Sequence, residues 1–178
     1  AGLDLGDRRR MLDLGGGPGT YAIHFCQHNP GLQATVYDLP ASRPLAEKVI
    51  ADFQLADRIS FVSGDYVHGE VQGSYDVIWM SHVLHGESPE DCREIVAKAV
   101  RVLEPGGLIL IHDFILENTR DAPLFPALFS LNMLVGTSGG RAYTQSELEA
   151  MLHRAGITDV RRTDFQGPNQ SGVLMGRK

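Results

Sequence analysis

Four glycines and one proline stand together at positions 15–19, and this run is the feature that most restricts what the chain can fold into. It follows the apolar segment 10–14, which is typical of a short buried strand, and it precedes segment 20–28, whose apolar residues recur at helical spacing. Glycine adopts positive φ without steric cost and leaves room for a close approach to the backbone. The run therefore predicts a tight turn that joins a strand directly to a helix.

The rest of the chain repeats this alternation. Segment 75–80 is a nearly continuous apolar run, as expected for a central parallel strand that is covered on both faces. Ser88 provides a helix N-cap before Pro89, and Thr144 opens a capping box with Glu147. Strands are expected at 10–14, 33–37, 59–62, 75–80, 108–111, 160–165 and 172–175. Helices are expected at 20–28, 44–55, 89–103, 124–135 and 145–155.

This order predicts an α/β fold with a doubly wound, mostly parallel, seven-stranded Rossmann-like sheet. Right-handed crossovers put helices on both faces and the ligand crevice at the carboxyl ends of the strands. The last two strands have no helix between them, so we expect them to pair as an antiparallel hairpin at one edge. The helix at 124–135 is apolar on nearly all sides, and we expect it to be covered all round. Residues 1–178 have the length of one domain.

The composition excludes several classes of protein. Hydrophobic residues make up 43% and charged residues 21% of the chain, which favours a packed core over disorder. The formal net charge is -6 and the basic residues cluster only at Arg8-Arg9-Arg10, so we expect neither a nucleic acid nor a membrane as partner. Two cysteines build no disulfide framework, and no segment is typical of a membrane span or a signal peptide. We therefore expect a soluble, cytoplasmic protein.

We also expect no metal site. The two cysteines lie far apart in the sequence and supply no metal-binding cluster. Five of the histidines share no metal-ligand spacing with cysteines or acids. These are His24, His28, His68, His112 and His153.

The glycine turn is placed to bind a nucleotide-like ligand. Gly17 to Ala22 fits the dinucleotide pattern G-x-G-x-x-A, so a nicotinamide-dependent oxidoreductase is one alternative. Asp13 before the turn favours a cationic amino acid moiety, because a carboxylate at that point would repel a pyrophosphate. Asp38 after the second strand suits ribose hydroxyls, and Asp65 after the third suits an adenine amino group. Together these acids favour S-adenosylmethionine as the cofactor.

A candidate general base follows the central strand. His85 comes shortly after this strand and Asp113 ends the neighbouring one, so both are expected at the ligand edge, where they can pair. The sulfonium methyl group is already activated, so the protein mainly has to align donor and acceptor and remove a proton from the attacking hydroxyl. Histidine titrates in the range needed to accept that proton, and a carboxylate would hold its ring. We predict that His85 is the base and Asp113 its partner.

Six segments, in order along nearly the whole chain, resemble the class I methyltransferases and, within them, the O-methyltransferases of plant phenolics and bacterial secondary metabolites. They are Leu12-Asp13-Leu14-Gly15-Gly16-Gly17, Tyr37-Asp38-Leu39-Pro40, Ser63-Gly64-Asp65-Tyr66, Val83-Leu84-His85, Gly106-Gly107-Leu108-Ile109-Leu110-Ile111 and Gly139-Gly140-Arg141. The resemblance implies a base at His85. It also implies a helical N-terminal dimerisation domain outside residues 1–178, so we interpret the chain as the catalytic domain of a protein that forms a homodimer. The family usually carries a second acid where this sequence has Ala142.

The predicted reaction transfers a methyl group from S-adenosylmethionine to a hydroxyl of a small aromatic or polyketide-like acceptor. Alternatives are C-methylation or a non-methylating reaction within the same family, the nicotinamide-dependent oxidoreductase, and a non-catalytic cofactor-binding module. The residues predicted to contact the cofactor are Asp13, Gly15, Gly16, Gly17, Asp38, Leu39, Gly64, Asp65, Tyr66, Ser81 and His82. The residues predicted to contact the acceptor are Phe129, Asn132 and Met133.

Overall fold

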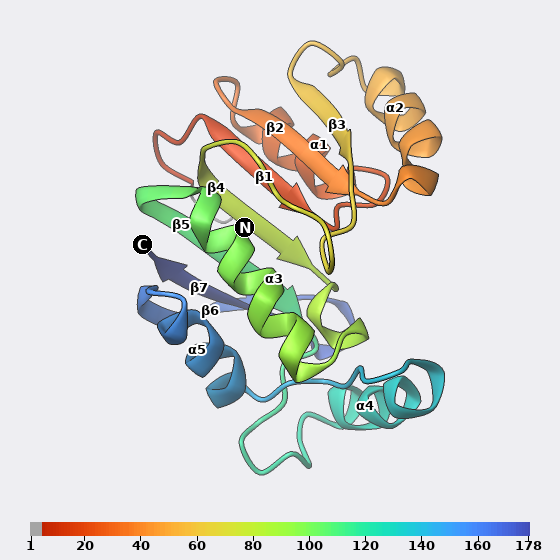
Figure 1. The fold of residues 1–178 in the computed structure, drawn as a ribbon, viewed down its shortest axis with the longest axis vertical. Coiled ribbons are helices and arrows are strands. Elements are labelled where there is room, and N and C mark those ends of the chain that lie inside the picture. Colours follow the sequence, from red (N-terminus) through yellow and green to blue (C-terminus); the bar gives the residue numbers. More distant parts are fainter. Residues whose placement is uncertain (1–4) are drawn as a thin grey trace.

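The computed structural model describes residues 5–178, which form one seven-stranded sheet with helices on both faces (Figure 1). The strand order is β3-β2-β1-β4-β5-β7-β6. The strands from β3 to β5 are parallel, whereas β7 runs antiparallel to both β5 and β6. The predicted fold class is confirmed, including the antiparallel edge. The strands are β1 (Arg10–Leu14), β2 (Gln33–Asp38), β3 (Ile59–Ser63), β4 (Tyr75–Ser81), β5 (Leu103–Asp113), β6 (Thr158–Gln166) and β7 (Gly172–Arg177).

The helices form two layers because successive residues of a strand point to opposite faces of the sheet. In the central strand β4, Val77 and Trp79 belong to a buried cluster with residues of α1 and α2. Ile78 and Met80 belong to a second cluster with residues of α3 and α5. Figure 1 shows α3 and α5 in front of the sheet and α1 behind it. The α-helices are α1 (Thr20–His28), α2 (Arg43–Asp52), α3 (Pro89–Val102), α4 (Leu124–Gly136) and α5 (Gln145–Arg154).

The predicted helix caps are present. Ser88 Oγ accepts a hydrogen bond from the Asp91 N–H at 3.1 Å at the start of α3. At the start of α5, Thr144 and Glu147 exchange side-chain and backbone hydrogen bonds as a capping box. Both caps satisfy backbone donors that have no partner within a helix.

Most predicted boundaries are within two residues of the observed ones, but one helix and one strand differ by three residues or more. Helix α2 ends at Asp52 instead of residue 55. Strand β5 begins at Leu103, directly after α3, although the prediction began it at residue 108. Tyr75 of β4 pairs with Leu103 before a shift in register, and Val77 then pairs with Leu108. The proline and glycines at 105–107 therefore lie within an irregular strand and do not form a separate loop.

The expectation that α4 is covered all round is wrong for the described residues. Leu124 is 68% exposed, Leu131 is 61% exposed and Val135 is 89% exposed. Pro126 is the one buried residue of this helix. Helix α4 lies beyond the carboxyl ends of the parallel strands, apart from both helix layers (Figure 1), and so packs on the rest of the chain through one side only. No helix within residues 5–178 is both long and apolar enough to cross a lipid bilayer.

Candidate active site

The turn between β1 and α1 holds three glycines at positive φ, of which Gly15 and Gly17 face the end of the sheet and Gly19 caps α1. Gly15 and Gly17 have φ of 70° and 52°, in the left-handed region where other residues are strained. A Cβ on Gly15 would lie 2.4 Å from Cγ2 of Val83, so the chain after β4 packs directly against the turn. A Cβ on Gly17 would meet no atom within 4 Å. The backbone of Gly17 is therefore open to a ligand, as the predicted cofactor cradle requires.

Asp13 lies beneath this turn and not on its open side. Its side chain is fully buried, and its Oδ2 accepts a hydrogen bond from the Ala22 N–H of α1 at 3.2 Å. A Cβ on Gly16 would lie 2.6 Å from Cγ of Asp13, so the backbone of the turn rests on the carboxylate. Burial raises the pKa of Asp13 to about 7; the Ala22 N–H opposes this rise and the charge of Asp38 adds to it. Direct contact between Asp13 and a cofactor stays a prediction.

Asp38 joins the end of β2 to the turn. Its Oδ2 accepts a hydrogen bond from the Gly17 N–H and its Oδ1 accepts one from the Leu39 N–H, both at 2.6 Å. A carboxylate oxygen can accept more than one hydrogen bond, so the group retains capacity for hydroxyl donors. Its position beside the open glycine fits the predicted role in binding a ribose diol.

Asp65 follows β3 in a loop that the protein holds firmly. Its Oδ1 accepts hydrogen bonds from the Val67 N–H at 2.7 Å and from the His68 N–H at 3.1 Å. The hydrogen bond from His68 makes the largest contribution to lowering the pKa of Asp65, so the carboxyl group stays ionised. Lys98 of α3 donates to the carbonyls of Tyr66 and Val67 in the same loop. The second carboxylate oxygen of Asp65 can accept from a donor such as an adenine amino group.

Ser81 and His82 stand at the end of β4. Ser81 Oγ lies 2.8 Å from Nδ1 of His112, so this hydroxyl is engaged within the protein. His82 has φ of 57°, and its ring centroid lies 4.6 Å from those of His112 and Phe114. Nδ1 of His82 lies 3.7 Å from Oδ1 of Asp113. The ring of His82 therefore faces the candidate base pair, and the predicted cofactor contacts of Ser81 and His82 stay predictions.

His85 and Asp113 pair, as the sequence predicted. Nδ1 of His85 lies 2.7 Å from Oδ1 of Asp113, which is 5% exposed. Burial by itself would raise the pKa of Asp113, but the neighbouring imidazoles of His82 and His85 and the hydrogen bond from the Phe114 N–H outweigh it and hold this pKa well below its usual range. An ionised Asp113 accepts the proton on Nδ1 of His85. This leaves Nε2 of His85 as the proton acceptor.

Aromatic rings surround this pair. The Phe129 centroid lies 4.8 Å from the His85 ring, and the Phe114 centroid lies 5.9 Å from it. Phe114 and Phe129 are 4.5 Å apart, and Phe125 lies 5.1 Å from Phe114. These three phenylalanines form what we call the aromatic wall. Such a surface packs against a flat apolar molecule and excludes water from the base.

The sequence identified only part of this wall. Phe129 was predicted and contacts His85, whereas Phe114 and Phe125 were not assigned to the site. The position of Phe114 directly after Asp113 was a signal that the sequence offered. Asn132 is exposed and Met133 is partly buried, and their predicted acceptor contacts stay predictions.

The segment 139–142 packs behind the base. A Cβ on Gly140 would lie 2.4 Å from the His85 carbonyl oxygen, which explains the need for a small residue there. Ala142 is 1% exposed, and its N–H donates to Ser130 Oγ of α4 at 3.1 Å. Asp113 is thus the acid that pairs with His85, and the buried methyl group of Ala142 adds none.

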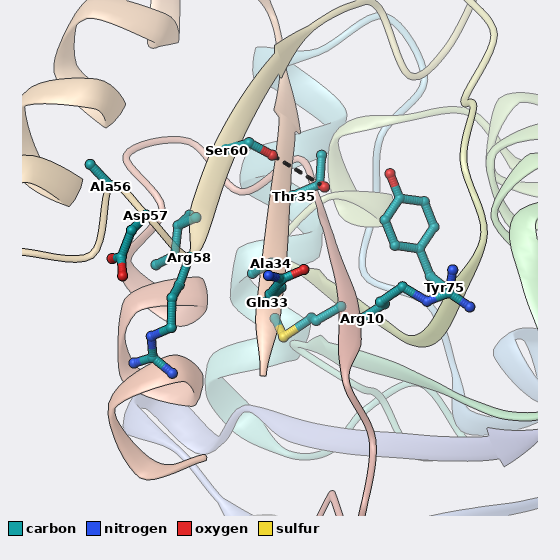
Figure 2. Close-up of a pocket in the computed structure, with 11 residues that line it drawn as sticks. Arg10, Gln33, Ala34, Thr35, Ala56, Asp57, Arg58, Ser60 and Tyr75 are labelled. Atoms are coloured by element: carbon teal, nitrogen blue, oxygen red, sulfur yellow. Dashed lines mark hydrogen bonds between the residues drawn. The ribbon is translucent and has the colours of Figure 1, made fainter. Parts of the chain in front are cut away.

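A separate pocket of about 280 Å³ lies at the amino-terminal ends of β1, β2 and β3, away from this site (Figure 2). Thr35 and Ser60 share a hydrogen bond of 3.4 Å across its wall. The Arg58 guanidinium points toward the end of α1, where it donates to the Cys26 and Pro30 carbonyls at 2.8 Å. This arginine supports a helix end and is not free to bind a ligand.

Comparison with known proteins identifies relatives over almost the whole chain. Residues 2–158 match the family model described as the O-methyltransferase domain. The chain is 36% identical, over 178 residues, to the 3-hydroxy-5-methyl-1-naphthoate 3-O-methyltransferase of Streptomyces sahachiroi, and it covers 51% of that protein. It is 32% identical to the L-tyrosine C(3)-methyltransferase of Streptomyces lavendulae, of which it covers 49%. The chain spans about half the length of these curated relatives.

Solved structures give the same result. The crystal structure of human N-acetylserotonin methyltransferase in complex with S-adenosylmethionine superposes with a TM-score of 0.86 at 29% sequence identity. The match covers 99% of this chain and 49% of the human one. The similarity therefore extends over both helix layers and the antiparallel edge of the sheet.

Proposed function

Because this chain belongs to the O-methyltransferase domain family, we propose that it is the catalytic domain of an enzyme that methylates a hydroxyl group of a small aromatic or polyketide-like acceptor. The observation that carries the proposal is the pairing of His85 with Asp113 at the same sheet edge as the open glycine turn. Cradle and base lie side by side because Val83, two residues before His85, packs against Gly15. Donor and acceptor sites thus share one crevice.

S-adenosylmethionine is the cofactor, and it supplies an activated methyl group. Its amino acid and nucleoside portions would be held by the residues that present open backbone or ionised oxygens at the sheet edge. The glycine turn offers the backbone of Gly17, Asp38 offers its carboxylate to a ribose diol, and Asp65 offers an acceptor to the adenine amino group. A dinucleotide pyrophosphate is disfavoured because the Gly17 N–H, which faces the open side of the turn, already donates to the Asp38 carboxylate.

The proposed work of His85 is to remove the proton of the acceptor hydroxyl as the methyl group is transferred. Asp113 orients the ring through Nδ1 and stabilises the imidazolium that forms at Nε2. The aromatic wall holds the flat acceptor against this nitrogen and limits the number of competing waters. Orientation and proton removal are what this methyl transfer requires of the protein.

Carbon methylation is the second candidate. A relative that is 32% identical is named as an L-tyrosine C(3)-methyltransferase, so a carbon atom is a second possible methyl acceptor for this chain. A phenol that loses its proton to His85 also becomes more nucleophilic at its ring carbons. The base therefore serves either outcome, and the orientation of the acceptor decides between them.

The wider context is part of the proposal. The full-length protein would be a cytoplasmic homodimer, with further chain supplying the dimerisation domain and closing the acceptor pocket. Neither a nucleic acid nor a membrane is proposed as a partner, since the net charge is -6.

The test uses the full-length protein with S-adenosylmethionine and a panel of hydroxylated naphthoates and phenols. We expect calorimetric binding of S-adenosylmethionine, none of NADH, and a methylated product whose formation drops at least about a hundredfold in His85→Gln. Tight binding of NADH alone, or full activity of His85→Gln, would contradict the proposal. Cofactor binding without turnover of any acceptor would favour the non-catalytic alternative.

A further inference from the structure

His82, His85 and Asp113 form a cluster that the proposed methyl transfer only partly uses. One nitrogen of each histidine and one oxygen of the carboxylate lie within 4.8 Å of one another. Two histidines and one carboxylate are ligand types that divalent transition metals accept. The proton-transfer role needs only His85 and Asp113, so it leaves the position of His82 unexplained.

His82 is held in place by its backbone. Its φ of 57° lies in the left-handed region, and its N–H donates to the His112 carbonyl at 2.9 Å. The ring centroids of Phe114 and His112 each lie 4.6 Å from that of His82. This strained backbone turns Nδ1 of His82 toward Oδ1 of Asp113.

The Nδ1 atom of His82 has no hydrogen-bond partner although it is buried. A buried nitrogen without a partner costs free energy, and native proteins rarely tolerate it without a reason. The distance of 3.7 Å to Asp113 is too long for a hydrogen bond but leaves space for a shared ligand between the two atoms. This unpartnered nitrogen is a second indication of a ligand, independent of the residue types.

We propose that His82, His85 and Asp113 bind a divalent transition metal ion, with Zn²⁺ as the best match. Zinc takes nitrogen and oxygen ligands at about 2.0–2.2 Å, so neighbouring ligand atoms in a tetrahedral site lie about 3.4 Å apart. Nδ1 of His82 lies 3.7 Å from Oδ1 of Asp113, close to this value. Nδ1 of His85 lies 2.7 Å from the same oxygen, so this distance has to lengthen by a few tenths of an ångström when the ion binds. Three protein ligands leave a fourth position for water or another small ligand.

The surroundings support this site. Asp113 is ionised and receives a hydrogen bond from the Phe114 N–H at 2.8 Å, which fixes the carboxylate as an outer-shell partner does in metal sites. The Phe114 ring packs against both histidines and the Phe129 ring packs against His85, and these apolar neighbours strengthen the attraction between the ion and the carboxylate.

The metal ion would inhibit methyl transfer. The ion uses His85 and Asp113 as ligands, so neither group can accept the proton of the substrate hydroxyl while the ion is bound. This consequence rests on the proposed function of His85. Binding of the ion itself does not, and so the two are measured separately.

Binding is tested by titrating Zn²⁺ into the metal-free full-length protein by calorimetry, with Co²⁺ absorption as a second readout of the coordination geometry. We expect one ion per chain in the micromolar range and visible bands typical of four-coordinate Co²⁺. His82→Asn should weaken binding by more than about tenfold, because it removes one ligand of three. Asparagine is chosen because it tolerates the left-handed backbone better than most residues.

The control variant is His24→Gln/His28→Gln, which removes two exposed imidazoles four residues apart on α1. It should leave the site intact, whereas loss of binding in this variant alone would assign the ion to the helix surface. Equal affinity in His82→Asn, with a circular dichroism spectrum like that of the wild type, would overturn the site. Asp113→Asn provides a second ligand deletion should His82→Asn fold poorly.

The activity arm adds Zn²⁺ and then EDTA to the methyl-transfer assay. We expect reversible inhibition with the same midpoint as the binding curve. Binding without inhibition would overturn the role of His85 as base and leave the metal site standing. If no acceptor is methylated at all, calorimetry and Co²⁺ absorption still decide the metal site.

Discussion

Nδ1 of His85 lies 2.7 Å from Oδ1 of Asp113, although the two residues are 28 positions apart in the chain. His85 lies in a short 3-10 turn after β4, and Asp113 is the last residue of β5. Parallel pairing of these strands brings both to the same edge of the sheet. The pair gives the first prediction.

Asp113→Asn should lower kcat by roughly a thousandfold while leaving the affinity for S-adenosylmethionine almost unchanged. An amide that donates toward Nδ1 stabilises the wrong tautomer of His85, and Nε2 then carries a proton. Steady-state kinetics with varied acceptor, together with cofactor titration, measure the effect. Asp76→Asn is the matched control, because Asp76 binds the Arg9 and Arg10 N–H groups at the opposite edge of the sheet. An unchanged kcat in Asp113→Asn would contradict the assignment.

Two alanine substitutions in the glycine turn should have different effects. Gly15→Ala should destabilise the fold severely, because its Cβ would lie 2.4 Å from Val83 in addition to the strain at positive φ. Gly17→Ala should cost only about 1 kcal/mol of stability, since its Cβ meets nothing, but should weaken cofactor binding by about tenfold or more. Urea unfolding and calorimetry separate the two effects. Gly136→Ala, at a position with open space, is the control, and equal losses of stability in the two turn variants would contradict the geometry.

Asp13 should make the stability of the protein fall as the pH rises from about 4 to about 7. Burial raises the pKa of this carboxyl from 3.8 to about 7, so between these values the folded state holds a proton that the unfolded state has released. The free energy of unfolding therefore decreases through this window, by about 4 kcal/mol.

Asp13→Asn removes this titration while keeping an acceptor for the Ala22 N–H. The difference in unfolding free energy between wild type and variant, measured with urea at pH 5 and pH 8, should shift in favour of the variant at pH 8. Because the other carboxyl groups titrate in both proteins, the difference isolates Asp13. A difference that does not change with pH would contradict a raised pKa.

Phe129→Ala should raise the KM for the acceptor by about tenfold, with little change in cofactor affinity. Its ring packs 4.8 Å from His85 and 4.5 Å from Phe114, so removing it opens the aromatic wall beside the base. Steady-state kinetics with each substrate varied in turn measure both parameters. Leu45→Ala, at a residue of α2 that is 56% exposed, should change neither. A loss of cofactor affinity with an unchanged KM for the acceptor would show that Phe129 contacts S-adenosylmethionine and not the acceptor.

Much of the fold was predictable because local signals agree with it. The glycine run, the continuous apolar strand β4 and the caps at Ser88 and Thr144 each act over a few residues, and the structure contains them as predicted. The antiparallel pairing of β6 with β7 follows from the short connection between them, which contains no crossover helix. We expected α4 to be buried on all sides, and among the described residues it is not. The apolar pattern shows which residues of a helix are hydrophobic, but it does not show which other segments pack against them.

The sequence by itself determined the glycine turn, the alternation of strands and helices, and the placement of His85 and Asp113 at one sheet edge. Only the tertiary structure decided that Asp13 lies beneath the turn, that Phe114 and Phe125 join Phe129, and that His82 faces Asp113. The physical reason is the sequence separation of the interacting residues. Turns and strands depend on residues that are close in sequence, whereas burial and ring contacts depend on segments that are far apart in sequence and meet only in the folded protein.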